Sequence, residues 1–277
     1  MSDKDGEVPP SRLGLMAGYG TFPLELASQL SAQGIEIHTV AAREETSSEI
    51  ERYSTSTSWL HVGQLGGMIR AFKSEGIKQM IFAGKVRKLH LFRNFRPDLT
   101  AIKTLARLSD RRDDTILKAI ADELEKNGIE VLPQTRYAGE MLAEEGHLFG
   151  PRPAKASGAD MDFGFSQARG IAALDIGQTV VVQEGAVLAV EAIEGTDEAI
   201  KRGGVLGSGK SVVVKVAKPN QDLRFDVPAI GPDTLDAMHA SGCNLLVVEA
   251  GKTLLLERQY VKKRAAEYGI SIFGMRG

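Results

Sequence analysis

Charged side chains follow a valine-rich run at residues 212–216, and their types and spacing suit phosphate and metal chemistry. The β-branched valines indicate a buried strand. Asp222, Arg224 and Asp226 come at i, i+2 and i+4, so an extended backbone would place two carboxylates and one guanidinium on the same face. Such a face could hold a divalent cation and a phosphate together. Two further cations, Lys215 and Lys218, precede it.

The same pattern has a competing structural interpretation. Strands at the edge of a sheet commonly carry charges that prevent pairing with another chain. The charges within residues 215–226 would serve that purpose without any chemistry. The spacing by itself does not choose between a site and a protected edge.

Any metal held by this chain is expected to have oxygen ligands. The histidines show neither H-x-x-x-H nor H-E-x-x-H spacing, the arrangements typical of zinc sites on helices. Cys243 is the only cysteine, which excludes an internal disulfide and a multi-cysteine zinc site. A lone cysteine also agrees with a reducing compartment, so a cytoplasmic location is expected.

Length and composition are those of an ordinary soluble protein. The chain has 277 residues, of which 43% are hydrophobic and 25% charged, and this length favours two domains. The formal net charge of −2 offers no overall attraction to nucleic acid, so an anionic ligand depends on local basic groups. The beginning of the chain lacks the basic and apolar regions of a signal peptide, and no stretch approaches the roughly 18 apolar residues of a membrane span. Neither secretion nor membrane spanning is expected.

The first half of the chain alternates short apolar strands with helices. This alternation is typical of a doubly wound parallel sheet with helices on both faces. We therefore predict an α/β protein whose N-terminal domain, residues 11–138, is Rossmann-like. The predicted strands are 13–17, 35–40, 59–62, 80–83 and 129–132, and the predicted helices are 22–33, 65–72, 98–108 and 113–126.

A linker is predicted at residues 137–162, where prolines and glycines replace the periodic pattern. A second, smaller α/β domain is predicted over residues 160–277. Its expected elements are a helix at 165–174, a hairpin of strands 179–182 and 187–193 turning at Glu184 and Gly185, a short helix capped by Thr196 or Asp197, the strand near 212, a helix at 233–240, a strand at 245–249, and a closing helix and strand.

Residues 204–211, GVLGSGKS, match the G-x-x-x-x-G-K-[ST] pattern of a phosphate-binding loop. A working loop of this kind follows a strand and opens a helix, whose amino end completes the anion site. Here the predicted order is reversed, with a helix before the pattern and a strand after it. We therefore interpret the pattern as a glycine loop in preference to a nucleoside-triphosphate site.

Gly18, Tyr19 and Gly20 begin like the dinucleotide-binding fingerprint of Rossmann domains. Pro23 stands where a third glycine would let the helix pack closely. An NAD(P) oxidoreductase is thus a weakly supported alternative, and a plain strand-to-helix turn is the simpler interpretation. The candidates for ribose binding after the second strand are also weak: Arg43, Glu44 and Glu45.

A basic segment at residues 85–96 interleaves cations with apolar side chains. Its first cation is Lys85, and its aromatic residues are Phe92 and Phe95. The segment suits a solvated face, but it equally suits an anionic amphiphile or a membrane surface. Both interpretations stay open at this point.

Six segments carry a family resemblance: LGLMAGYGTFP, FRPDLT, LDIGQTVVV, AVEAIEGTD, KVAKPNQDLRFDVPAIG and VVEAGKTLLLE. Together they resemble the UDP-2,3-diacylglucosamine pyrophosphatase family of lipid A biosynthesis, of the LpxI type. The resemblance covers nearly the whole chain from Arg12 onward. Because several long motifs share one order, it is more specific than either phosphate pattern. Two small departures are the GSGKS loop and the SDRRDD stretch at residues 109–114.

The resemblance implies a magnesium-dependent hydrolase that cuts UDP-2,3-diacylglucosamine into UMP and 2,3-diacylglucosamine 1-phosphate. It places this reaction at the cytoplasmic face of a Gram-negative inner membrane, with the lipid in or near a cleft between two domains. The expected partners are therefore the glycolipid and the membrane surface, with no nucleic acid, and a homo-oligomer is left open. The competing class is a non-catalytic nucleotide-sugar or lipid-binding module.

A hydrolase of this kind must neutralise phosphoryl oxygens and place a water in line with the bond to be broken. We expect Asp226 to bind magnesium or to orient the water, and Asp222 to be its partner. Lys215, Lys218 and Arg224 are expected to clamp the phosphates. The other residues expected to bind substrate are Gly18, Gly20, Lys85, Glu194, Thr196, Asp197, Glu249 and Lys252.

Overall fold

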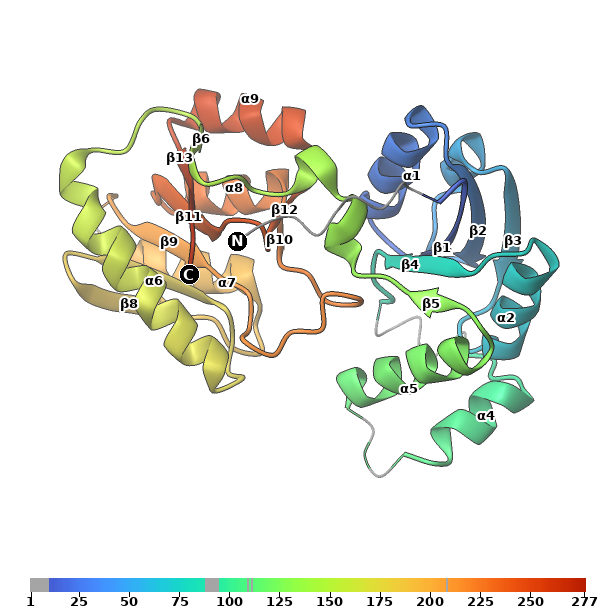
Figure 1. Cartoon of the computed structure of the whole chain (residues 1–277). Coiled ribbons are helices and arrows are strands. Elements are labelled where there is room, and N and C mark those ends of the chain that lie inside the picture. The colour runs from blue at the N-terminus through green and yellow to red at the C-terminus, as the bar shows by residue number, and fades with distance from the viewer. Residues whose placement is uncertain (1–9, 88–94, 109, 111, 208) are drawn as a thin grey trace. The chain divides into compact units, whose positions relative to one another are not determined.

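The computed structural model describes residues 10–87, 95–108, 110, 112–207 and 209–277 (Figure 1). The chain forms two compact units, Met1–Tyr137 and Ala138–Gly277, called unit 1 and unit 2 below. Each unit has its own sheet and its own core. The two-domain α/β class predicted from the alternation of strands and helices is confirmed.

Unit 1 is built on a parallel sheet of five strands in the order β3-β2-β1-β4-β5. The inner strands form where apolar residues run together, and Leu13 and Leu15 of β1 are fully buried. Strands buried on both faces are typical of parallel sheets covered by helices. The strands are β1 (Arg12–Ala17), β2 (Glu36–Ala42), β3 (Ser56–Leu60), β4 (Gln79–Ala83) and β5 (Glu130–Val131).

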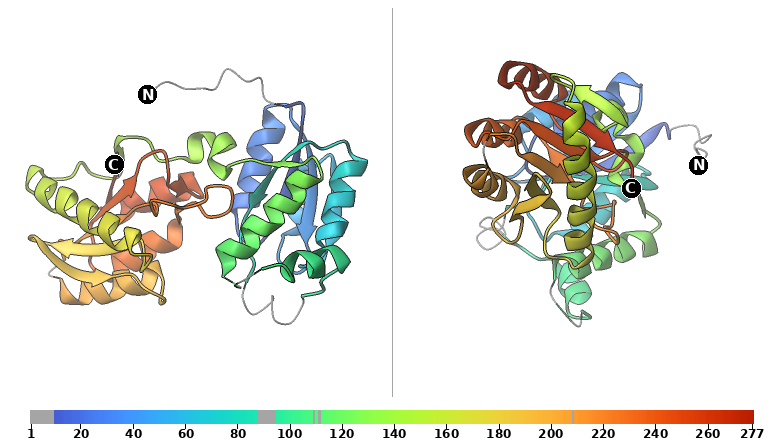
Figure 2. Two further views of the ribbon diagram at one scale, coloured as in Figure 1. Left: turned by 60° about the horizontal axis from the view of Figure 1, so that its bottom comes forward. Right: turned by 90° about the vertical axis from the view of Figure 1, so that its left-hand side faces the viewer.

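Helices cover both faces of this sheet (Figure 2). The connection through α1 leads from β1 to β2, whereas the connection through α2 leads from β3 across to β4. Right-handed crossovers in opposite directions place these two helices on opposite faces, so the sheet is doubly wound as predicted. The helices are α1 (Phe22–Ala32), α2 (Leu65–Ser74), α4 (Leu99–Leu105) and α5 (Asp113–Lys126), with 3-10 turns η1 (Ser48–Tyr53) and η2 (Gln134–Tyr137).

Unit 2 is built on a mixed sheet of six strands in the order β6-β13-β11-β9-β7-β8. The three central strands β13, β11 and β9 are parallel, and the outer ones pair antiparallel. The strands are β6 (Gly146–Phe149), β7 (Thr179–Gln183), β8 (Ala186–Val190), β9 (Val212–Lys215), β11 (Leu245–Glu249) and β13 (Ser271–Met275), and a small second sheet pairs β10 (Ala229–Ile230) with β12 (Leu254–Leu255).

Part of the segment predicted as a linker is folded into unit 2. Strand β6 pairs with β13, and the 3-10 turns η3 (Gly139–Met141) and η4 (Lys155–Ser157) flank it. Helix α6 (Gly158–Ala173) also begins within the predicted linker. The prolines and glycines of this segment led to the prediction of a linker, but short edge strands tolerate both residues. The two units therefore divide the chain almost equally.

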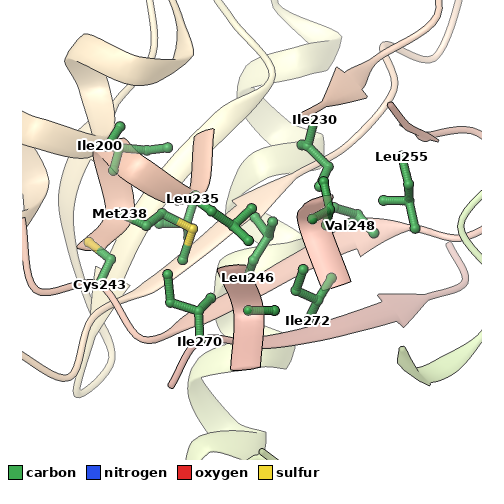
Figure 3. Close-up of a cluster of buried hydrophobic side chains, with 14 of the residues drawn as sticks. Ile200, Ile230, Leu235, Met238, Cys243, Leu246, Val248, Leu255, Ile270 and Ile272 are labelled. Carbon is green, nitrogen blue, oxygen red and sulfur yellow. The ribbon is translucent and has the colours of Figure 1, made fainter. Parts of the chain in front are cut away.

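The strands of unit 2 alternate their side chains between two layers of helices. Val212 and Val214 of β9 pack in one cluster with Phe165 of α6. Val213 packs in a second cluster with residues of α7, α8 and α9, among them Leu235 (Figure 3). Each valine buried in this way stabilises the fold by about 1.5–3 kcal/mol. The helices of the second layer are α7 (Thr196–Leu206), α8 (Pro232–Ala240) and α9 (Arg258–Tyr268).

The hairpin between β7 and β8 is confirmed with the predicted turn. Glu184 and Gly185 have φ angles of 50° and 73°. Positive φ at both central residues is the mark of a tight turn that matches the twist of the two strands. Within the described ranges, no helix combines the length and the apolar character needed to cross a membrane.

Candidate functional site

Most of the candidate residues in the second half of the chain gather at one edge of the unit 2 sheet. Parallel strands β9 and β11 lie side by side and end at Lys215 and Glu249. Strand β7 begins at the same edge, because Thr179 lies opposite Lys215. In α/β sheets, ligands bind just beyond the carboxyl ends of the parallel strands. We call this region the β9–β11 edge; it comprises the loop 216–228, the start of α7 and the segment 249–253.

The loop after β9 is a turn and not a strand. The backbone N–H groups of Phe225 and Asp226 both donate to the carbonyl oxygen of Asp222, at 3.0 and 3.1 Å. The prediction that residues 222–226 are extended, with Asp222, Arg224 and Asp226 on one strand face, is therefore wrong. Asp222 also accepts a bond from the Arg224 backbone N–H at 3.1 Å. Such local side-chain bonds favour turns over ladders, which explains the difference.

The turn holds Asp222 and Arg224 as an ion pair. Arg224 Nε lies 3.0 Å from Asp222 Oδ1, and Nη2 lies 2.8 Å from Oδ2. Both side chains are about a quarter exposed. The guanidinium also lies over the ring of Phe225, 5.2 Å from its centroid. A two-point pair of this kind fixes the plane of the guanidinium and so aims its remaining donors.

Asp226 is exposed at the end of the same turn. Its Oδ2 accepts a hydrogen bond of 2.6 Å from Gln221 Nε2. Gln221 Oε1 in turn accepts 2.8 Å from the backbone N–H of Lys218. Gln221 thus connects Lys218 to Asp226 across the loop. The sequence interpretation missed this residue, because a neutral amide carries no charge signal of its own.

Lys218 lies at the beginning of the loop, and its side chain is one-third exposed. Its Nζ lies 2.6 Å from Oδ1 of Asp175, which follows α6 and has a positive φ of 56°. The pair connects the β9 loop to the segment that leads into β7. A cation at this position can turn toward a bound anion at little cost, because exposed ion pairs are worth at most about 1 kcal/mol.

Lys215 is buried, with 7% of its surface exposed. Its Nζ donates to Thr196 Oγ1 at 2.9 Å, and the Thr196 hydroxyl donates to Glu191 Oε1 at 2.9 Å. Glu191 is also buried. The hydroxyl therefore bridges an ammonium and a carboxylate beneath the start of α7. Glu191 was missed by the sequence interpretation, although its motif, AVEAIEGTD, was recognised.

The start of α7 brings two more candidates to this edge. Glu194 pairs with Arg202 at 2.6 Å, and its own backbone N–H together with that guanidinium holds the pKa of the carboxyl below its usual range. Asp197 lies in the first turn, where the helix dipole favours an anion. The prediction that Thr196 or Asp197 caps this helix is wrong. Gly195, with φ of 87°, is the cap residue, and Thr196 uses its hydroxyl for Glu191 instead.

Glu249 closes the edge from β11. It is 3% exposed, and its Oε2 accepts the backbone N–H of Ala217 at 2.8 Å. Its Oε1 pairs with Lys252 Nζ, also at 2.8 Å. A buried carboxylate that receives a backbone N–H and an ammonium is well satisfied. Glu249 therefore anchors the first residues of the loop 216–228 to the end of β11.

The candidates Gly18, Gly20 and Lys85 lie together in unit 1. They follow β1 and β4, the two neighbouring strands between which the strand order reverses. The backbones of Tyr19 and Lys85 exchange two hydrogen bonds of 2.7 and 3.1 Å. A Cβ at Gly18 would lie 2.7 Å from the carbonyl oxygen of Lys85, so this approach requires glycine. The three residues are thus brought to the switch point of the unit 1 sheet.

The structure also tests the interpretations given to the two phosphate-binding patterns. The GVLGSGKS pattern begins inside α7 and leads into β9, so the reversed order of helix and strand is confirmed. The carboxyl end of a helix offers carbonyl groups, which repel phosphate.

In the region that resembles a dinucleotide-binding fingerprint, Pro23 lies in the first turn of α1. The ribose candidate Glu45 is buried and pairs with Arg87 at 3.0 Å, so its carboxylate is engaged within unit 1.

Among the described residues, no group of three or more His, Cys, Asp or Glu side chains is arranged to hold a metal ion. The loop 216–228 brings two carboxylates to the β9–β11 edge, those of Asp222 and Asp226. Magnesium commonly takes one or two protein carboxylates and completes its shell with waters and substrate phosphates. The donor set fits magnesium that is bound together with a phosphorylated substrate.

Comparison with known proteins places the chain in a family. The description "LpxI N-terminal domain" matches residues 12–141, and "LpxI C-terminal domain" matches residues 144–273. A relative from Caulobacter vibrioides, named UDP-2,3-diacylglucosamine pyrophosphatase LpxI, is 35% identical over 275 residues, which cover 95% of this chain and 97% of the relative. The chain belongs to the LpxI family. The resemblance inferred from the six segments is thereby confirmed, and every residue of the β9–β11 edge lies within the LpxI C-terminal domain.

Proposed function

We propose that this LpxI family member hydrolyses the diphosphate of UDP-2,3-diacylglucosamine to UMP and 2,3-diacylglucosamine 1-phosphate, with magnesium, in lipid A biosynthesis. The relative with the pyrophosphatase name aligns along nearly the whole chain. The observation that carries the proposal is the single turn that holds two carboxylates and an oriented guanidinium beyond the end of β9. This is the set of groups that diphosphate hydrolysis requires.

The cations of the loop act on the diphosphate. A diphosphate carries negative charge that repels an attacking water, and fixed cations lower this repulsion most in the transition state. Arg224 is suited to bind two phosphoryl oxygens through its planar donors, and Asp222 keeps it aimed. Lys218 adds a mobile point charge at the entrance of the loop.

Asp226 acts on the water. Gln221 holds one oxygen of its carboxylate and so fixes the plane in which the other oxygen lies. A carboxylate held in this way can orient a water and accept its proton as the new P–O bond forms. Because this task arises mainly in the transition state, Asp226 contributes to turnover more than to binding.

Asp226, joined by Asp222, would hold the magnesium ion. When bound, magnesium would neutralise negative charge on the phosphoryl oxygens in the transition state. The remaining ligands would be substrate oxygens and waters, in keeping with the usual coordination of this ion.

The buried groups position these residues. Lys215 lies directly under the start of α7, where its ammonium is tied to Thr196 and thereby to Glu191. Glu249 fixes the origin of the loop through Ala217. Exposed groups at the same edge, Lys252 among them, are left to contact the sugar phosphate. Glu194 and Asp197 lie beside them at the start of α7.

Contact with the lipid is assigned to an exposed apolar surface of unit 1. Phe95, Leu99 and Ile102 are 40%, 75% and 50% exposed. Leu99 and Ile102 lie three residues apart on α4, next to Lys103. Exposed apolar side chains beside cations suit the cytoplasmic surface of the inner membrane, from which a diacyl substrate is drawn. Phe92, the other aromatic residue predicted for this role, lies outside the described residues.

The deciding experiment incubates the pure protein with UDP-2,3-diacylglucosamine and magnesium and measures released UMP. Release that stops with a chelator and returns with magnesium supports the proposal. Asp226→Ala serves as the control for contaminating hydrolases. Bound glycolipid without turnover would instead support a non-catalytic module, and reduction of NAD(P) would support the oxidoreductase alternative.

A further inference from the structure

We propose that the outward face of α7 binds a second copy of this chain across a two-fold axis. The face includes Ile193, which precedes the helix, and the outward side chains Glu198, Lys201, Arg202 and Leu206; it is called the α7 surface below. A two-fold dimer is the commonest assembly of identical chains, and each copy then contributes the same surface.

Helix α7 forms one side of unit 2. It covers the strands β7 and β8 at one edge of the six-stranded sheet and packs beside α8, whereas α9 contacts β6 at the other edge. Ala199 and Ile200 of α7 are fully buried on the inward face. Because side chains three or four residues apart share one face of a helix, the α7 surface points away from this core. It is therefore accessible to a partner.

Apolar side chains are exposed at both ends of the α7 surface. Ile193 is fully exposed, and Leu206, the last residue of the helix, is 64% exposed. A shallow hollow lies between them along the outward side chains of the helix. Exposed apolar side chains that adjoin a hollow and are rimmed by polar groups are typical of protein–protein contact sites.

The charges of the α7 surface complement those of a second copy. Glu198 lies in the amino half of the helix and Lys201 in the carboxyl half. An antiparallel pairing that places Glu198 opposite Lys201 of the second copy also places Ile193 opposite Leu206, because both pairs have the same midpoint in the chain. The two-fold axis repeats each contact. One register therefore joins opposite charges in the middle and apolar side chains at both ends.

The ion pairs within one chain leave this pairing open. Lys201 Nζ lies 2.7 Å from Glu198 Oε1, and both side chains are more than half exposed. Exposed pairs of this kind contribute at most about 1 kcal/mol, so the two side chains can turn to the second copy at little cost.

Arg202 directs the contact to the helix and away from the sheet. Its Nη2 donates to the Val190 carbonyl of the edge strand β8 at 2.7 Å and pairs with Glu194 at 2.6 Å. A carbonyl that is already bonded in this way disfavours the addition of a strand from another chain. An arginine fixed by two partners is also a typical component of protein interfaces.

The balance of charge favours a second copy over a membrane or a nucleic acid. The acids Glu194 and Glu198 line the hollow together with the bases Lys201 and Arg202. Anionic lipids and phosphate backbones are bound by surfaces with an excess of cations. A surface with equal numbers of both signs is complementary to itself in the antiparallel register.

The test measures the mass of the full chain by sedimentation velocity over a wide range of concentrations. We expect a reversible dimer. Ile193→Asp and Leu206→Asp should each raise its dissociation constant about tenfold or more, because a charge then enters an apolar contact. Tyr260→Asp is the matched control and should leave the dimer intact, since Tyr260 is 61% exposed on α9. Circular dichroism verifies the fold of each variant.

A charge exchange tests the register. Glu198→Lys and Lys201→Glu should each weaken the dimer, because like charges then meet twice across the axis. An equimolar mixture of these two variants should dimerise again, since opposite charges face each other at both contacts. This recovery cannot come from a change within one chain.

A chain that is monomeric at every concentration would overturn the proposal. A dimer that withstands both Ile193→Asp and Leu206→Asp would place the interface elsewhere and overturn it as well. Failure of the mixed variants to associate would overturn the antiparallel register. A monomer whose binding to anionic vesicles falls in Leu206→Asp would assign the α7 surface to a membrane in place of a second copy.

Discussion

The carboxylate of Asp222 holds the guanidinium of Arg224, two residues further along the chain, by contacts of 3.0 and 2.8 Å. The pair exists because the backbone turns at these residues, with the Asp226 N–H bonded to the Asp222 carbonyl. The same carboxylate also accepts the Arg224 backbone N–H at 3.1 Å, a local bond that favours a turn over a strand. The turn therefore converts two charged residues into one oriented anion-binding group.

A double-mutant cycle tests this coupling. Asp222→Asn should lower kcat/KM about tenfold or more, because Arg224 loses the charge-assisted bonds that aim it. Arg224→Ala should cost more. In the double variant the two losses should be clearly less than additive, as expected for residues that act as a unit. Full additivity would show that Asp222 acts on magnesium or substrate independently of Arg224.

Asp226→Ala should lower kcat by about 10²-fold or more, the scale observed when one preorganised electrostatic group is deleted. Substrate affinity should change by only a few-fold, because the carboxylate acts mainly in the transition state. Steady-state kinetics and direct substrate binding separate the two effects. Gln221→Ala should give a milder fall in kcat, since it only loosens the Asp226 carboxylate. A folded Asp226→Ala protein with normal kcat would move the catalytic centre elsewhere, first to Glu194 and Asp197.

Lys210→Ala should leave activity within about threefold, because the GVLGSGKS pattern lies at the carboxyl end of α7 and has the wrong flanking elements for a phosphate cradle. Lys218→Ala is the matched comparison, a lysine removed from the β9–β11 edge, and should lower kcat/KM much more. Initial rates at several substrate concentrations check both variants. A hundredfold loss in Lys210→Ala would restore the glycine loop as a binding element.

Replacing Leu99 and Ile102 with Ser should weaken binding to anionic vesicles that contain the diacyl substrate, since these side chains are 75% and 50% exposed beside cations. Vesicle co-sedimentation measures the change, and circular dichroism verifies the fold. Val205→Ser, an exposed apolar side chain of unit 2, is the control and should have no effect. Phe95→Ser is a poorer probe, because the ring packs against Gly63 and its loss would also affect stability. Unchanged vesicle binding by the Leu99 and Ile102 variant would assign the membrane contact elsewhere.

Cys243 is buried, and burial raises the pKa of its thiol to about 11 from an ordinary value of 9.0. A raised pKa in the folded state means that this group favours folding while it is protonated and opposes folding as pH rises from about 9 to about 11. Stability measured by urea unfolding should therefore fall over that window, and Cys243→Ala should remove part of this fall. At neutral pH a thiol reagent should label the folded chain far more slowly than the unfolded chain. Rapid labelling under native conditions would show that the thiol is accessible.

The sequence by itself determined the class of fold and the family. Hydrophobic period and glycine placement predicted the alternation of strands and helices in unit 1, because these signals act over a few residues. The same local logic predicted the turn at Glu184 and Gly185 and the reversed order around the GVLGSGKS pattern. The long motifs predicted the family, and the comparisons confirm it.

Only the tertiary structure decided how the candidate residues are grouped. The order β6-β13-β11-β9-β7-β8 brings the loop 216–228, the start of α7 and the end of β11 to one edge, although they are far apart in the chain. Strand order depends on long-range packing, which no local pattern encodes. The same packing buries Lys215 against Thr196 and Glu191, a placement that the prediction of Lys215 as a phosphate clamp did not include. It also turns residues 222–226 away from a strand, because β9 ends at Lys215 and side-chain bonds then shape the backbone.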